Sequence, residues 1–267
     1  MKDKINILGV CIDALTKEKL YEKIEDLLNS KDDIKIFTPN PQILMKAQKN
    51  DSIKNILNSA TISIPDGTGV IWCSKTLRTP LPERLTGIDT AEYILTLAVK
   101  KNLSVFLLGG QDDVVKLAKC RLEEKYKGLK ICGVNHGFFD LQGDENKQVI
   151  SQINSSGADI LFVCMGFPRQ EIWITENMPK LSSVRLSIGL GGSLDVWSGR
   201  LRRAPAVFRK LSLEWLWRMM LEPKRMRFLP VIPVFVFKIL RERCSKGSKL
   251  SKNNGKNALK QAFFGEK

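Results

Sequence analysis

The sequence predicts an α/β fold with a mainly parallel sheet, followed by a basic, α-helical C-terminal appendage. Up to about residue 195, apolar runs of strand length alternate with amphipathic runs of helix length, which is typical of α/β folds. The 267 residues, of which 43% are hydrophobic, suffice for one large domain with an appendage. The formal net charge is +15, and residues 196–267 carry 18 Lys and Arg against 4 Asp and Glu. The body is therefore nearly neutral, and the basic C-terminal quarter implies an acidic partner.

The first part of the body predicts strands that alternate with helices. Residues 5–10 are expected to form the first strand, and Thr16 can cap the helix that follows. Residues 34–38 are expected to form a second strand, which ends with Thr38 and Asn40 just before another helix. Polar side chains at the carboxyl end of a strand lie where open α/β sheets bind their ligands.

The stretch ISIPDGTGV, residues 62–70, is the point around which the body is organised. Its apolar run stops at Pro65, so Asp66 stands at the carboxyl edge of a strand and just before a helix. Gly67 permits close approach of the backbone, while Thr68 and the unpaired N–H groups of the helix start suit an anion. A carboxylate beside an anion site suits a general base. The alternative is that Asp66 only caps the helix, and both interpretations fit this stretch.

A long connection follows, with the sequence RTPLPERLTGID over residues 78–89. It contains two prolines and the pair Glu83 and Arg84, which we expect to be exposed. A connection of this length is either a binding loop or irregular surface, and we favour a binding loop.

Later strands also end in glycine or polar residues. Residues 103–108 lead into Gly109 and Gly110, a pair that can cradle a phosphate but is not the full dinucleotide fingerprint. Residues 160–165 lead into GFPRQ, where Gln170 lies in the first turn of a helix and could reach a sugar or a base edge. The last strand closes with GLGGSLD. These strand ends thus converge on one expected edge of the sheet, which weighs more than any single motif.

Some chemistries are excluded by the residue types present. The six cysteines are scattered and form no C-x-x-C pair, as expected of buried side chains in a reducing compartment. His136 is the only histidine and no H-E-x-x-H or D-x-D spacing occurs, so we expect no metal held by the protein and no cofactor. The N-terminal apolar stretch is too short for a signal peptide, which predicts a cytoplasmic protein. Chemistry is therefore expected to depend on carboxylates and arginines.

Three segments are expected: residues 1–195 as the catalytic body, 196–244 as a membrane-associating appendage and 245–267 as a disordered tail. Residues 206–221 have the pattern of an amphipathic, basic helix that carries tryptophans. Residues 228–237 are wholly apolar but far shorter than the roughly 20 residues that span a bilayer, so we expect them to lie in the membrane interface. The alternative is an ordinary core helix with a solvated basic face.

Several motifs together resemble the WecG/TagA/CpsF family of bacterial glycosyltransferases. They are TPNPQ, IPDGTGV, ERLTGID, VCMGFPRQEIW, IGLGGSLDVWSGRLRRAP and LEWLWRMMLEPKRMRF, in the family's order and spacing. The resemblance implies a Rossmann-like α/β body with a C-terminal membrane-targeting appendage. It also implies transfer of a sugar from a UDP-sugar to undecaprenyl-diphosphate-linked N-acetylglucosamine, at the cytoplasmic face of the membrane. The chain is most similar to the TagA branch, which uses N-acetylmannosamine and makes the linkage unit of wall teichoic acid.

The same resemblance assigns roles to individual residues. The expected catalytic residues are Asp66 as the base, Thr38, Arg84, Arg218 and Arg225. The resemblance also implies that Gln170 and Arg227 bind substrate. The strand ends described above add Asn40, Gly67, Thr68, Gly109, Gly110 and Gly191 to the expected substrate-binding residues. Inverting transfer needs a base for the acceptor hydroxyl. Without a metal, arginines suit the leaving diphosphate because they stay charged and bind phosphate oxygens bidentately.

Other functions also fit parts of the sequence. Family members that use another donor, such as N-acetylmannosamine uronate, share these motifs. A nucleic-acid-binding protein would explain the basic tail, but the chain has no recognition-helix, RNP or OB signature, so no nucleic-acid partner is expected. An NAD-dependent oxidoreductase would need a complete glycine fingerprint, which this sequence lacks.

The expected partners are a UDP-sugar, a polyprenyl-diphosphate-linked acceptor and an anionic membrane surface. Apolar surface left uncovered without a membrane would favour oligomers.

Overall fold

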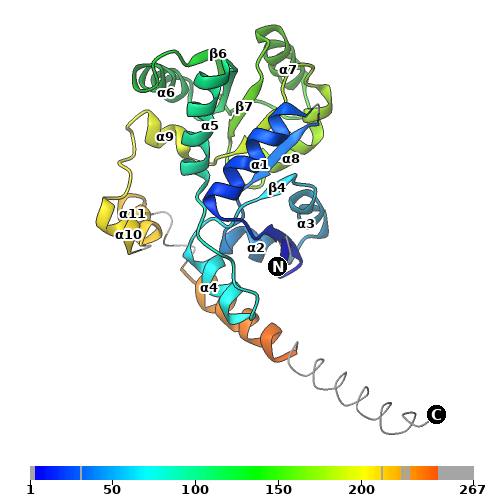
Figure 1. Cartoon of the computed structure of the whole chain (residues 1–267), viewed down its shortest axis with the longest axis vertical. Coiled ribbons are helices and arrows are strands. Elements are labelled where there is room, and N and C mark those ends of the chain that lie inside the picture. The colour runs from blue at the N-terminus through cyan, green and yellow to red at the C-terminus, as the bar shows by residue number, and fades with distance from the viewer. Residues whose placement is uncertain (1–3, 31, 212, 224–225, 227–228, 246–267) are drawn as a thin grey trace, which may run out of the picture.

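The computed structural model describes residues 4–30, 32–211, 213–223, 226 and 229–245 (Figure 1). The predicted site residues Arg225 and Arg227 lie outside the described residues, as does the predicted tail from residue 246 onward.

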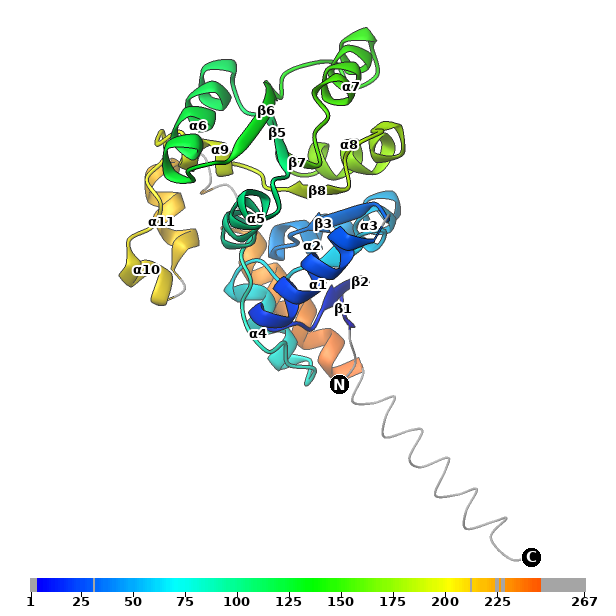
Figure 2. The ribbon, with the colours of Figure 1, turned by 45° about the horizontal axis from the view of Figure 1, so that its top comes forward.

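A six-stranded, all-parallel sheet forms the centre of the body, in the order β4-β3-β8-β7-β5-β6 (Figure 2). Its strands are β3 (Ile34–Phe37), β4 (Ile62–Ser63), β5 (Ser104–Gly109), β6 (Lys130–Asn135), β7 (Ile160–Cys164) and β8 (Leu186–Gly189). Because all six strands run the same way, their carboxyl ends meet at one edge of the sheet. The α/β fold with a Rossmann-like body is confirmed.

Helices cover both faces of this sheet (Figures 1 and 2). One face packs against α1 (Lys17–Asn29), α5 (Gly87–Lys101), α6 (Asp112–Lys125) and α9 (Ser193–Trp197). The other face packs against α2 (Pro41–Ala47), α3 (Asp51–Asn58), α7 (Asp144–Ser156) and α8 (Arg169–Asn177), the last of which is followed by the 3₁₀ turn η1 (Met178–Lys180). Strand residues alternate between the two cores: in β5, Val105 and Leu107 face one core while Phe106 and Leu108 face the other. Such strands are buried on both faces, which explains their uninterrupted apolar sequences.

The first apolar run forms a separate hairpin, so the expected single strand over residues 5–10 is wrong. β1 (Lys4–Ile7) pairs antiparallel with β2 (Val10–Asp13), and neither strand joins the main sheet. Leu8 and Gly9 between them have positive φ angles of 51° and 90°, a conformation in which glycine lets the chain reverse at little cost.

The 78–89 connection is shorter than the sequence suggested. Thr86 caps α5, because its Oγ1 accepts the Asp89 N–H at 3.2 Å, so the helix begins at Gly87. The remaining loop runs from the end of α4 (Thr68–Thr76) to Thr86.

After α9, the described residues form two short helices and one longer one. Residues 206–221 form α10 (Ala206–Lys210) and α11 (Glu214–Leu221) rather than one continuous helix. Residues 231–245 are also helical, and in Figure 2 this helix lies in orange beside α4. Phe235 and Ile239 are buried in the core of the body, whereas Phe237 is 65% exposed. One side of this helix therefore packs on the body and another side presents apolar surface.

The proposed boundary after residue 195 falls inside α9, whose Trp197 stacks on Phe162 of β7 with ring centroids 5.8 Å apart. Among the described helices, none combines the length and the apolar character that a membrane span requires.

Candidate active site

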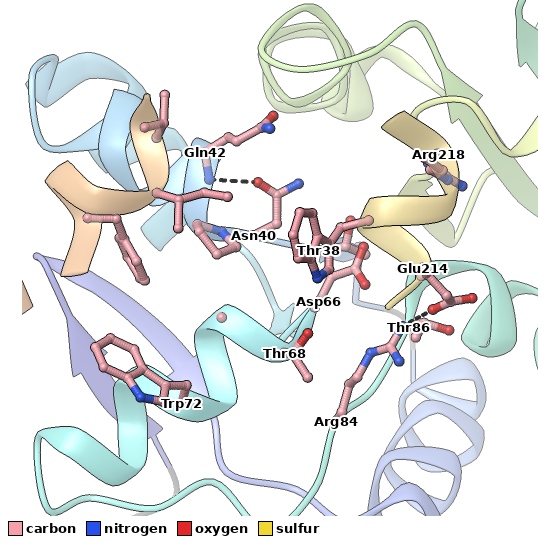
Figure 3. A pocket seen from close by; sticks show the side chains of 18 of the residues that line it. Thr38, Asn40, Gln42, Asp66, Thr68, Trp72, Arg84, Thr86, Glu214 and Arg218 are labelled. Atoms are coloured by element: carbon pink, nitrogen blue, oxygen red, sulfur yellow. Dashed lines mark hydrogen bonds and ion pairs between the residues drawn. The ribbon is translucent and has the colours of Figure 1, made fainter. Parts of the chain in front are cut away.

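A cavity of about 530 Å³ lies at the carboxyl edge of the sheet, beside the ends of β3, β4 and β8 (Figure 3). The C-terminal helices close its other side with α11 and the first turns of the 231–245 helix. Its volume is within the range of sites for small molecules. Of the predicted site residues, it brings together Thr38, Asn40, Asp66, Gly67, Thr68, Arg84 and Arg218.

Asp66 reaches the cavity through a short connection from β4. Its backbone N–H donates to the carbonyl of Pro39 at 3.2 Å, which ties this connection to the one after β3. Gly67 follows with φ 89° and is the N-cap of α4, which has no side-chain cap. The structure therefore argues against the alternative that Asp66 serves as the helix cap, and leaves its carboxylate on the cavity wall.

Burial raises the pKa of Asp66 to about 6, and the charges around the cavity modulate that value. Arg218 and Arg84 favour the carboxylate and lower the pKa, whereas Glu214 and Asp89 raise it. A carboxyl group that titrates near neutral pH is well matched to accepting a proton from a hydroxyl.

Arg84 is half-buried rather than exposed as expected, with 20% of its side chain accessible. Its guanidinium forms an ion pair with Glu214 of α11, which Figure 3 marks with a dashed line. Arg218, one turn further along α11, also faces the cavity. The predicted binding loop and the appendage thus meet at one site.

Glu214 was not among the residues predicted from the sequence. It is one of only four acidic residues in the basic segment 196–267, and that contrast is the signal that could have singled it out.

Thr38 and Asn40 form the wall after β3. The Thr38 hydroxyl donates to the carbonyl of Gly189 at 3.4 Å, which connects the ends of β3 and β8. Asn40 caps α2, because its Oδ1 accepts the N–H groups of Gln42 and Ile43 at 3.0 and 3.1 Å. Both residues line the cavity while also fixing its walls.

Gln170 is not among the residues that line the cavity. Its side chain is 3% exposed, and its Oε1 accepts the N–H groups of Gly166 and Gly191 at 3.2 and 2.9 Å. Its Nε2 donates to Oε1 of Glu171 at 2.8 Å. Gln170 is therefore a brace: its hydrogen bonds hold the loops after β7 and β8 together. The N–H group of Gly191 is its partner in the loop after β8.

Gly109 and Gly110 also lie outside the cavity lining. Gly109 has φ 135°, and a Cβ there would stand 2.4 Å from the carbonyl oxygen of Cys164. Gly110 donates its N–H to that same carbonyl at 3.3 Å. This glycine pair lets the ends of β5 and β7 approach closely, a packing role that the sequence motif alone did not distinguish from phosphate binding.

Exposed apolar side chains stand among the residues that line the cavity: Trp72 of α4, Trp215 of α11 and Ile232 are 40%, 45% and 43% exposed. The cavity therefore combines charged side chains such as Asp66 and Arg84 with an exposed apolar rim, which suits a ligand that has a charged head and an apolar tail.

Within the described residues, no three His, Cys, Asp or Glu side chains gather closely enough to hold a metal ion. The expectation that catalysis proceeds without a metal stays a prediction.

Comparison with known proteins gives a family and close relatives. Residues 5–249 match the family described as glycosyl transferase WecG/TagA/CpsF. A protein of Staphylococcus aureus strain NCTC 8325 / PS 47 is 36% identical over 242 residues, which cover 90% of this chain and 93% of that protein. Its counterpart in strain MRSA252 is 35% identical over the same shares. Both are named N-acetylglucosaminyldiphosphoundecaprenol N-acetyl-beta-D-mannosaminyltransferase.

Proposed function

The chain belongs to the WecG/TagA/CpsF family of glycosyltransferases, and from that premise we propose that it transfers N-acetylmannosamine from UDP-N-acetylmannosamine to N-acetylglucosamine linked to undecaprenyl diphosphate. The names of the relatives support this sugar and this acceptor. The observation that carries the proposal is the position of Asp66 on the cavity wall, with a pKa near 6 and with Arg84 and Arg218 close by.

In the proposed reaction, Asp66 removes the proton of the acceptor hydroxyl as that oxygen attacks the anomeric carbon. The bond between this carbon and the β-phosphate oxygen breaks, and its electron pair leaves with UDP. Attack opposite the leaving group inverts the anomeric configuration. A positioned base typically contributes about 10²- to 10⁴-fold to the rate.

The charge that develops on the leaving diphosphate is stabilised by Arg84 and Arg218. Guanidinium groups can bind phosphate oxygens bidentately. The backbone N–H groups at the start of α4 add dipoles directed at an anion. We propose that these groups do the work that a metal ion does elsewhere, so no cofactor is needed.

The acceptor is a lipid, and we propose that the enzyme works while bound to the inner face of the cell membrane. The basic C-terminal segment would be attracted to anionic lipids, and the apolar rim of the cavity would contact the acyl region. In this arrangement the acceptor's diphosphate and sugar enter the cavity while its polyprenyl chain stays in the bilayer. Such a product is the linkage unit on which wall teichoic acid is built.

The test is a transfer assay with the full chain, UDP-N-acetylmannosamine and a short polyprenyl diphosphate that carries N-acetylglucosamine. We expect a disaccharide with inverted anomeric configuration, identified by NMR, and undiminished turnover in EDTA. Transfer from the uronate donor instead would show that the transferred sugar is the uronate and not N-acetylmannosamine. Loss of activity in EDTA with recovery in Mg²⁺ would contradict the arginine mechanism, and failure to bind any UDP-sugar would contradict the proposal itself.

A further inference from the structure

Among the described charged residues that line the cavity, Glu214 is the one that the proposed reaction does not use. Its side chain is 22% exposed, and it faces Arg84 from a segment 130 residues further along the chain. In Figure 3 the Arg84 guanidinium points at the Glu214 carboxylate, with Asp66 nearby. The Glu214 carboxylate is therefore paired with Arg84, the cation that the leaving diphosphate would need.

The ion pair leaves part of the guanidinium unused. Glu214 engages Nη2 of Arg84, whereas Nε of Arg84 is buried and has no hydrogen-bond partner within the described residues. A guanidinium presents donors in a fixed fork, which matches two oxygens of one phosphate group better than a single carboxylate oxygen. Arg84 is thus half-buried and paired with Glu214, but not all of its donors have a hydrogen-bond partner within the described residues.

We propose that Glu214 is a built-in counter-ion of Arg84, which the donor's diphosphate displaces on binding and which promotes release of UDP after transfer. The inference rests on the proposed function, since it assumes a nucleoside diphosphate in this cavity. A diphosphate carries more negative charge and more oxygens than one carboxylate, so it can displace Glu214. Once the sugar has been transferred, Glu214 competes with UDP for Arg84 and weakens the binding of this product.

This competition would lower the affinity for UDP, which favours turnover. Tight binding of the diphosphate in both the ground state and the product complex would slow release without speeding the chemical step. Glu214 lowers the affinity of the enzyme for UDP. Because Glu214 lies on α11, the C-terminal segment contributes to setting this affinity.

The experiment is a calorimetric titration of the full chain with UDP, alongside steady-state kinetics. We expect Glu214→Gln to bind UDP about tenfold more tightly, because Arg84 is freed. The variant should also show a lower KM for the donor, a lower kcat and stronger product inhibition by UDP. Arg84→Gln combined with Glu214→Gln should show no gain over Arg84→Gln alone, since the competition needs both partners.

Glu124→Gln is the matched control, because Glu124 is an exposed residue of α6 and its loss changes the net charge equally. This variant should bind UDP as the wild type does. If Glu214→Gln is unstable, Glu214→Asp gives a second test, with a smaller gain in UDP affinity expected from its shorter reach.

Folded Glu214 variants that bind UDP equally or more weakly would overturn the inference. So would loss of turnover by about 10²-fold or more at unchanged UDP affinity, which would make Glu214 the base. A wild-type chain that does not bind UDP would instead refute the proposed function, so the two failures are distinguishable.

Discussion

The residue on which the proposed chemistry depends most is Asp66. Because burial raises its pKa to about 6, the ionised carboxylate is held in the folded protein at a cost in stability. Asp66→Asn removes that charge but keeps the shape of the side chain. We expect turnover to fall by at least about 10²-fold, UDP binding to stay nearly unchanged, and the melting temperature at pH 7.5 to be equal or higher. Asp26→Asn, at an exposed position of α1, is the control. Normal turnover in Asp66→Asn would remove Asp66 from the mechanism.

The pH dependence of turnover gives a second test at this scale. Asp66 accepts a proton only when ionised, so kcat should fall as the pH drops through about 6. Arg218 lowers the pKa of Asp66, so Arg218→Gln should move this acid limb to higher pH, while Arg218→Lys should leave it nearly in place. The measurement is kcat between pH 5 and 9 in buffers of constant ionic strength. An acid limb that does not move in Arg218→Gln would show that Arg218 does not influence the base.

Glu171 is a buried carboxyl group next to the brace formed by Gln170. Burial raises its pKa to about 7, while the hydrogen bond from Gln170 acts in the opposite direction. Its Oε2 is buried without a hydrogen-bond partner among the described residues, which favours the neutral acid. The stability that the neutral form contributes is present below the ordinary pKa of 4.5 and is lost as the pH rises through 7.

Glu171→Gln has the shape of the neutral acid and still accepts from Gln170. We therefore expect it to raise the free energy of unfolding by about 1–3 kcal/mol at pH 8, with the gain shrinking toward pH 5. Urea unfolding at both pH values measures this difference. Glu176→Gln, at an exposed position of the same helix, should show no such pH-dependent change. A gain that is equal at both pH values would mean that Glu171 is not the titrating group.

The sequence could predict a site residue when local sequence positions it, but not when tertiary contacts do. Asp66 and Arg84 follow or precede recognisable elements, so the local sequence could single them out, and both line the cavity. Glu214 meets Arg84 only through tertiary packing across 130 residues, and no local pattern encodes that contact. The polar character of Gln170 suggested a ligand, but its hydrogen bonds go to backbone groups of two loops that become neighbours only in the folded sheet.

At the scale of elements, the N-terminal hairpin protects the edge of the sheet at β4. Asp13 at the end of β2 is 1% exposed; it accepts the Ser63 N–H at 2.9 Å and pairs with Lys23 at 2.9 Å. Asp13→Ala would leave a buried N–H of β4 without its acceptor, which costs about 1–3 kcal/mol. We expect a loss of this size in urea unfolding. Asp26→Ala, at an exposed position of α1, should change stability by no more than about 0.5 kcal/mol. A loss no larger than that of the control would show that the hairpin is not needed to close the sheet edge.

The strands were the elements that the sequence predicted best, because the strands of a covered parallel sheet read as short apolar runs. The hairpin was missed for the same reason, since its apolar residues run almost without interruption through the turn at Leu8 and Gly9. The start of α5 was assigned to the preceding loop because its prolines dominate the local pattern, and only the cap at Thr86 marks the boundary.

At the scale of the whole molecule, basic charge and exposed apolar side chains occur in the same C-terminal part of the chain. The helix over residues 231–245 buries Phe235 and Ile239 in the body and exposes Ile232, Phe237 and Leu240. Because Phe235 and Ile232 also line the cavity, the surface that would contact lipid is continuous with the site. Membrane binding and catalysis are therefore expected to share this helix while depending on different side chains.

Phe237→Asp separates these two roles, because Phe237 is 65% exposed and does not line the cavity. The change removes an apolar group from the interface and adds a charge that anionic lipids repel, so we expect affinity for phosphatidylglycerol vesicles to fall by about tenfold or more. Flotation measures this affinity. Transfer to the polyprenyl acceptor should fall with it, while UDP binding and transfer to a water-soluble acceptor analogue stay unchanged.

Leu117→Asp is the control. It makes the same kind of change on α6, where the Leu117 side chain is 42% exposed, and this variant should float like the wild type. If Phe237→Asp also floats like the wild type, this face of the helix is not the membrane contact, and the lipid acceptor must reach the cavity from another side.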